Sequence, residues 1–139
     1  MSNINIPILM YHSIELMPKT TTMRSLHVPI RRFKFQMWLL KLFGFKGLSM
    51  SQLKPYIDGD KSGKVVGITF DDGYQNNLIN AAPILRKYNF SATCYLVSQR
   101  IGLSNTWDAD KGITQRPLMS CQEIQEWIDD CLLPFDHRV

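Results

Sequence analysis

Residues 64–73 read KVVGITFDDG, and the fold class follows from them. Their run of valine, isoleucine, threonine and phenylalanine has the length and β-branched content of a strand that is covered on both faces. Similar runs stand at residues 6–11 (IPILMY) and 91–97 (SATCYLV). Because segments with helical spacing separate these runs, the chain is predicted to form parallel βα units of an α/β fold.

Between the first two strands, the sequence predicts a longer helix, a short strand at residues 45–48 and a short helix at residues 51–56. The longer helix is marked by apolar residues at helical spacing and by a glycine that ends it. These residues are Phe33, Met37, Leu40, Leu42 or Phe43, and Gly44.

Two further helices are predicted after residue 73. An apolar stripe runs from Leu78 to Tyr88, but Pro83 lacks a backbone donor and is unfavourable deep inside a helix. The regular helix is therefore predicted at residues 81–88, preceded by a turn. Ser120, with Glu123 three residues later, has the capping-box pattern and predicts the start of a last helix.

The bulk composition, 45% hydrophobic and 20% charged, indicates one globular domain over residues 1–139. The formal net charge is +4, and the densest basic group is Arg31, Arg32 and Lys34. This group is interpreted as a solvated helix face, with an anionic polymer or a lipid surface as the alternative. No nucleic-acid partner and no transmembrane segment are predicted. The start of the chain lacks the pattern of a secretory signal, so a cytoplasmic protein is expected.

Two adjacent carboxylates, Asp71 and Asp72, follow the buried strand at residues 64–70. The carboxyl ends of parallel strands are where ligands and catalytic groups gather. Neighbouring carboxylates repel each other in a dry site unless a cation neutralises one of them, which assigns one Asp to a metal and leaves the other as a base. Gly73 allows a sharp turn beneath them. The alternative is that both aspartates cap the following turn in solvent.

Residues 69–97 (TFDDGYQNNLINAAPILRKYNFSATCYLV) resemble the first motif of the polysaccharide deacetylase family and the helix and strand that follow it. Residues 8–14 (ILMYHSI) resemble the opening strand of a branch of that family that acts on poly-N-acetylglucosamine-type polymers. The similarity extends over about residues 4–130. The TFDDG motif with its flanking βα unit is specific for this family. The MYH sequence alone would be weak evidence for it.

The resemblance implies a metal-dependent hydrolase that removes N-acetyl groups from a polysaccharide or oligosaccharide. Asp71 matches the catalytic base and Asp72 matches a carboxylate ligand of a divalent metal, most often zinc. His12 matches the histidine that protonates the leaving amine in this branch. For His12, the alternative is an ordinary histidine at the end of a strand. The sequence does not indicate an oligomeric state.

The end of the sequence departs from the family pattern. The family completes its metal site with an HxxxxH pair, and no two of the three histidines here have that spacing. His137 lies about where the first histidine of the pair would fall, which makes it a candidate metal ligand, and the second would fall beyond Val139. We therefore expect a single truncated domain that forms the first half of a partial (β/α) barrel.

Two other functions remain open from the sequence alone. One is a non-catalytic remnant or carbohydrate-binding module of the same fold. The other is a phosphate-handling α/β enzyme with an Asp nucleophile. The second is disfavoured because the two aspartates are contiguous and because no Gly-rich phosphate loop is present.

Overall fold

The computed structural model describes residues 5–19 and 21–132. Its centre is a parallel sheet around β5 (Val65–Asp72). On one edge β5 pairs with β1 (Ile8–Tyr11), and on the other it pairs first with β4 (Lys46–Leu48) and then with β6 (Thr93–Leu96). The prediction of parallel βα units is confirmed.

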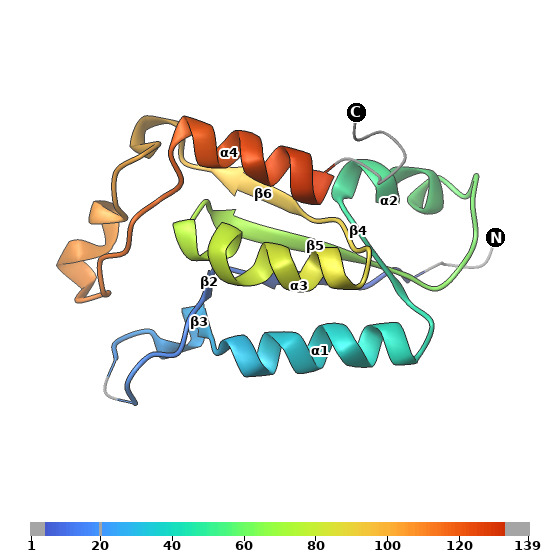
Figure 1. Ribbon diagram of the computed structural model, residues 1–139, viewed down its shortest axis with the longest axis horizontal. Coiled ribbons are helices and arrows are strands. Elements are labelled where there is room, and N and C mark those ends of the chain that lie inside the picture. Colours follow the sequence, from blue (N-terminus) through green and yellow to red (C-terminus); the bar gives the residue numbers. More distant parts are fainter. Residues whose placement is uncertain (1–4, 20, 133–139) are drawn as a thin grey trace.

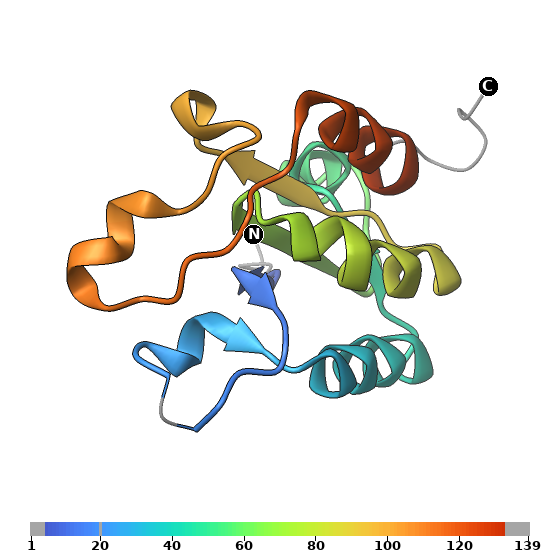
Figure 2. The same cartoon turned by 60° about the vertical axis from the view of Figure 1, so that its left-hand side comes forward.

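The central strand is covered on both faces. Residues 65–70 of β5 are buried without interruption, as the β-branched run predicts. The helices α1 (Ile30–Leu42), α3 (Ala82–Lys87) and α4 (Cys121–Trp127) lie side by side against one face (Figures 1 and 2). The helix α2 (Met50–Ile57) packs on the opposite face, where Leu53 Cδ2 lies 3.0 Å from the position of a Cβ on Gly67.

Smaller elements connect these layers. Two short strands, β2 (Ser13–Ile14) and β3 (His27–Val28), form a separate parallel pair between β1 and α1. The remaining short helical segments are Arg24–Leu26, Asn77–Ala81, Ser98–Arg100, Thr106–Lys111 and Ile128–Leu132. Ser120 caps α4 through a complete capping box with Glu123, which confirms that prediction.

The core on the three-helix face is built around the ring of Phe70. Its centroid lies 5.6 Å from that of Tyr11, 5.8 Å from that of Phe33 and 5.3 Å from that of Trp127. These rings come from β1, α1 and α4. One side chain of β5 therefore packs against three parts of the chain that are distant in sequence. Edge-to-face and offset contacts of this kind stabilise beyond the burial of area.

Two details of the predicted helices differ from the structure. The turn before α3 is a π-helical segment, Asn77–Ala81, because Pro83 has no N–H to donate to the preceding turn. At the end of α1, Leu42 and Phe43 are exposed, although the spacing suggested that one of them would face the core. Gly44 does end the helix, with φ +81°.

Gly47 in β4 lies directly against the core. A Cβ at this position would lie 2.6 Å from Ile68 Cδ1 and 2.8 Å from Phe90 Cγ. Replacing Gly47 by alanine is expected to lower the free energy of unfolding by about 1–3 kcal/mol, because buried neighbours must shift to admit a methyl group. Chemical denaturation measures this loss, and Lys46→Ala, at an exposed position of the same strand, is the control. A Gly47→Ala protein as stable as the control would contradict the prediction.

Candidate active site

The register of β1 and β5 brings His12 next to Asp71. Tyr11 pairs with Phe70, so the next residue of each strand continues the same parallel register. His12 Nε2 lies 3.7 Å from Asp71 Oδ2, and the two side chains are 23% and 31% exposed. The structure therefore brings together the predicted acid and the predicted base.

This pair lies on the sheet face opposite the aromatic core. Side chains alternate along a strand, so Asp71 and Phe70 point to opposite faces. On the Asp71 side, the neighbouring strands contribute Met10 and Tyr95, which are 63% and 52% exposed. The half-buried carboxylate and imidazole are therefore reachable from solvent beside an exposed aromatic ring.

A tight backbone turn follows Asp71. Asp72 has φ +75° and Gly73 has φ +70°, two consecutive residues in the left-handed region. Such a conformation is costly for a residue with a Cβ and is typical of functional sites. Two backbone hydrogen bonds join this turn to residues 117–119. Met119 N–H donates to the Gly73 carbonyl, and Gln75 N–H donates to the Pro117 carbonyl. The sharp turn expected at Gly73 is confirmed.

Helical backbone begins at Gln75, and the π-helical segment Asn77–Ala81 follows it. Asn76, which directly precedes that segment, makes no side-chain capping hydrogen bond. Asp71 lies within β5 and pairs with Tyr95 of β6. Asp71 is therefore a strand residue near the carboxyl end of β5 and does not cap that segment.

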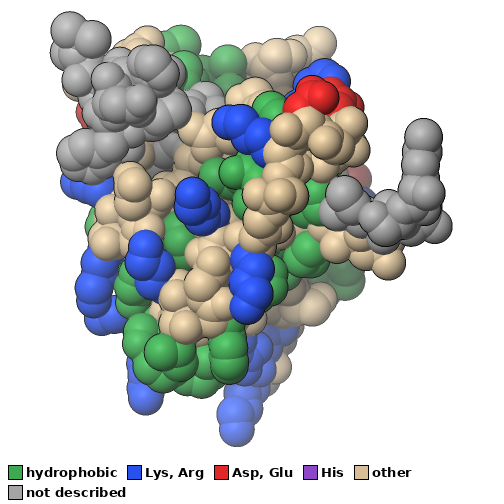
Figure 3. Space-filling model, turned by 90° about the vertical axis from the view of Figure 1, so that its right-hand side faces the viewer, with side chains coloured by type: hydrophobic (Ala, Val, Ile, Leu, Met, Phe, Trp, Pro, Cys, Tyr) green, Lys and Arg blue, Asp and Glu red, His purple; other side chains and the backbone are tan. Residues whose placement is uncertain are grey.

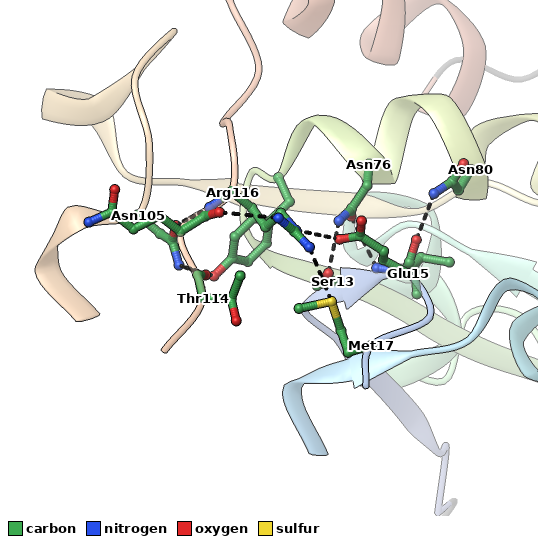
Figure 4. Close-up of polar contacts among 11 residues, drawn as sticks. Ser13, Glu15, Met17, Asn76, Asn80, Asn105, Thr114 and Arg116 are labelled. Carbon is green, nitrogen blue, oxygen red and sulfur yellow. Dashed lines mark hydrogen bonds and ion pairs between the residues drawn. The ribbon is translucent and has the colours of Figure 1, made fainter. Parts of the chain in front are cut away.

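Two asparagines fix the chain that follows His12. Asn76 Oδ1 accepts from Ile14 N–H at 3.0 Å, and Asn76 Nδ2 donates to Ser13 Oγ at 2.8 Å. Asn80 Nδ2 donates to the Ile14 carbonyl at 2.8 Å. Ser13 and Ile14 are fully buried. Three hydrogen bonds therefore join the segment after the TFDDG motif to the segment after His12 (Figure 4).

An ion pair extends this contact to a third segment. Arg116 Nε lies 2.7 Å from Glu15 Oε2, and the Arg116 guanidinium also contacts the Met17 sulfur. Asn105 accepts from the Arg116 N–H and donates to the Tyr74 hydroxyl. Figure 4 shows these groups in one chain of contacts beside the asparagines. Sequence reasoning missed this network, for which the only local sign is the run of polar residues at 75–77 in a helical region.

Replacing Asn76 by alanine is expected to lower the free energy of unfolding by about 1–3 kcal/mol, because the buried Ile14 N–H loses its acceptor. Denaturation of the variant measures this loss. The matched control is Gln125→Ala, which removes an exposed amide that donates to Asp129. Equal stability of the two variants would show that the asparagine contributes nothing to holding the chain after His12.

Two other titratable groups lie near the pair. His27, opposite Ser13 in the β2–β3 register, is buried, and burial lowers the pKa of its ring although Glu15 opposes that shift. Burial raises the pKa of the Cys94 thiol to about 12, and the charges of Asp71 and Asp72 add to the rise. Cys94 therefore stays a protonated thiol near neutral pH and does not act as a nucleophile.

The described residues do not complete a metal centre. In residues 5–19 and 21–132, no three or more His, Cys, Asp and Glu side chains are grouped so that they could hold a metal ion. The predicted ligand Asp72 lies at the end of β5. His137, the other predicted ligand, falls outside the described residues.

Comparison with known sequences points to one family. Residues 58–124 match the family model described as polysaccharide deacetylase. The chain is 39% identical over 99 residues to Bacillus subtilis YxkH, which carries a provisional polysaccharide deacetylase name. It is 29% identical over 124 residues to the poly-beta-1,6-N-acetyl-D-glucosamine N-deacetylase of Staphylococcus epidermidis. These matches cover 70% and 88% of this chain but 33% and 40% of the two relatives, so the chain spans less than half of their length.

Solved structures of deacetylases share the fold. The Streptococcus pyogenes deacetylase PplD in complex with acetate superposes with a TM-score of 0.70 at 25% identity, over 94% of this chain and 55% of that one. IcaB from Ammonifex degensii superposes with a TM-score of 0.74 at 21% identity, over 91% and 50% of the two chains. The predicted α/β fold, consistent with a partial barrel, is confirmed. This chain contains part of a polysaccharide deacetylase domain.

Proposed function

We propose that this chain supplies the acid and base residues of an enzyme that removes N-acetyl groups from a polysaccharide or oligosaccharide. The observation that carries the proposal is the proximity of two side chains at the ends of paired strands. His12 Nε2 lies 3.7 Å from Asp71 Oδ2. Hydrolysis of an acetamide needs one group that takes a proton from the attacking water and another that protonates the departing nitrogen. A carboxylate and an imidazole facing one substrate can divide these tasks.

The roles follow from the chemistry of the two groups. An ionised carboxylate has no proton to give, so Asp71 is the base that accepts the proton of water. A protonated imidazole donates from either ring nitrogen, so His12 is the acid that protonates the nitrogen as the carbon–nitrogen bond breaks. The Asp71 carboxylate and the His12 ring lie 3.7 Å apart, close enough to act on the same acetamide.

Asp72 is proposed as one ligand of a divalent metal, most often zinc in proteins that this chain resembles. Because the described residues do not complete the ligand set, no step of the reaction is assigned to the metal. Calorimetric titration with zinc measures whether the chain retains it. The comparison with Asp72→Ala then shows whether this carboxylate contributes to the affinity.

Acetate release from oligomers of N-acetylglucosamine tests the activity itself. The rate is measured for the unmodified chain with added zinc, with a chelator and with the His12→Gln variant. We expect release that the chelator suppresses and that the variant loses. If His12→Gln releases acetate as fast as the unmodified chain, the assignment of the acid is wrong.

A second candidate is a non-catalytic carbohydrate-binding role. It is favoured by the lack of a three-ligand metal group among the described residues and by the exposed Tyr95 ring next to Asp71, since aromatic faces can stack on sugar rings. This role predicts oligosaccharide binding without acetate release. It also predicts an affinity that Asp72→Ala leaves unchanged.

A further inference from the structure

Charge is distributed very unevenly along the chain. Residues 16–57 contain eight Lys and Arg residues and no Asp or Glu, so this segment carries +8. The rest of the chain carries −4, which together gives the formal net charge of +4. The central element of the basic segment is α1. A surface built from this segment therefore has a strongly positive potential that the overall net charge conceals.

The helix α1 has two opposite apolar faces. Phe33 and Met37 are fully buried against the core. Phe35, Trp38 and Leu42 lie about 140–200° around the helix axis from Phe33, at about 100° per residue. These three side chains are 55%, 44% and 60% exposed, and the rings of Phe35 and Trp38 are in contact, with centroids 5.7 Å apart.

The outer apolar stripe of α1 is not covered by any of the residues that the structure describes. Helices of a (β/α) barrel contact the sheet with one face and neighbouring helices with their flanks, so the side opposite the sheet faces outward. Phe35, Trp38 and Leu42 occupy that outward side, and Phe43, at 61% exposure, continues it. Exposed apolar stripes of this kind mark sites of interaction with a partner or a membrane.

The basic residues in the first part of α1 do not stabilise the helix. Arg31, Arg32 and Lys34 stand near its N-terminus, where the helix dipole disfavours positive charge, and the first turn has no acidic residue. Among the described residues, no ion pair with a carboxylate is formed by any of the three. Their charge is therefore available to an anionic partner outside the chain.

Apolar and basic side chains meet on one surface. Figure 3 shows the face of the molecule that includes the C-terminal end of α1, and apolar side chains in its lower part lie between Lys and Arg side chains. An interfacial helix has this composition, because its apolar residues enter the boundary of the acyl chains while Lys and Arg extend to anionic headgroups. No helix of the described residues is long and apolar enough to cross a membrane.

We propose that α1 docks this domain onto the surface of an anionic lipid bilayer through Phe35, Trp38, Leu42 and Phe43, with Arg31, Arg32, Lys34 and Lys41 on the headgroups. A nucleic acid or another anionic polymer would satisfy the charges but would leave the aliphatic side chain of Leu42 in water. A bilayer satisfies both sets of side chains. Charge and apolar surface together therefore favour the lipid surface.

Trp38 is a built-in reporter of this contact. Trp127 is buried, and Trp107→Phe removes the other partly exposed indole, so the fluorescence change on binding then reports Trp38. The protein is mixed with vesicles of equal parts phosphatidylglycerol and phosphatidylcholine, or of phosphatidylcholine alone. We expect a blue shift of the emission and quenching by lipids brominated on their acyl chains. Both changes should be confined to the anionic vesicles and should weaken as salt is added.

Two double variants separate a local site from general charge. Arg31→Gln with Lys34→Gln is expected to weaken vesicle affinity about 25-fold, from about fivefold for each charge near an anionic surface. Arg100→Gln with Lys111→Gln removes the same charge outside the basic segment and should have a much smaller effect. Phe35→Ser with Leu42→Ser should abolish the quenching by brominated lipid. Circular dichroism verifies that each variant keeps the fold.

Two outcomes would overturn the proposal. Equal losses in the two charge variants, without quenching of Trp38 by brominated lipid, would show adhesion by net charge alone. Concentration-dependent self-association that Phe35→Ser with Leu42→Ser abolishes, without vesicle binding, would show that a second copy covers the stripe. The assay contains no sugar substrate, so its result is independent of the proposed deacetylation.

Discussion

Replacing Asp71 by asparagine is expected to lower the rate of acetate release by about 10²–10⁴-fold, the range for loss of a positioned general base. Asparagine has nearly the same shape as aspartate but does not accept a proton at neutral pH, so the change removes the chemistry and keeps the packing. The rate is measured with oligomers of N-acetylglucosamine. Thermal unfolding of the same sample is expected to change little.

The matched control for this variant is Asp58→Asn. Asp58 is an exposed carboxylate that pairs with Lys54 far from the pair at the sheet end, and its loss should leave the rate unchanged. Asp71→Asn also has a readout that needs no turnover. Because the His12 ring lies 3.7 Å from the Asp71 carboxylate, its resonances in NMR spectra should move in this variant and not in the control. A full rate in Asp71→Asn would place the base elsewhere.

The elements whose signals are local could be predicted from the sequence. The buried strand β5 is indicated by its uninterrupted run of β-branched residues. The turn that follows it is indicated by Gly73. The start of α4 is encoded by Ser120 and Glu123 alone, because a capping box closes within four residues. These features depend on neighbours in sequence, which a single sequence contains in full.

The contacts that build the candidate site depend on pairs far apart in the chain. The sequence places His12 and Asp71 at strand ends, but only the parallel register of β1 with β5 sets them side by side. The hydrogen bonds of Asn76 with Ser13 and Ile14 join residues 63 and 62 positions apart in the sequence. Such distant contacts have no local signature.

The second apolar stripe of α1 shows another limit of periodicity. A helical pattern marks which residues share a face, but it does not say which of two apolar faces enters the core. Phe33 and Met37 do so, whereas Leu42 and Phe43, which continue the apparent pattern, are exposed. The packing of α1 against β5 and α3 makes this choice, and it leaves the outer stripe for the proposed bilayer contact.

Replacing Phe70 by alanine is expected to lower the free energy of unfolding by about 3–5 kcal/mol, as for other large aromatic residues deleted from a core. Phe70 is fully buried, and its ring contacts those of Tyr11, Phe33 and Trp127, so the loss removes packing from β1, α1 and α4 together. Chemical denaturation measures the change. Phe70→Leu should recover part of the stability because it fills part of the cavity. Phe35→Ala, at the exposed position on α1, should change it by less than about 0.5 kcal/mol.

This prediction also connects the core to the candidate site. Phe70 precedes Asp71, and its partner in the register, Tyr11, precedes His12. The stacked rings of Tyr11 and Phe70 thus fix, from the buried face, the two strand ends whose next residues meet on the open face. A cavity at Phe70 should therefore shift the NMR resonances of His12 even where the protein remains folded. Unchanged His12 resonances in a folded Phe70→Ala protein would show that the asparagine contacts alone set the position of the histidine.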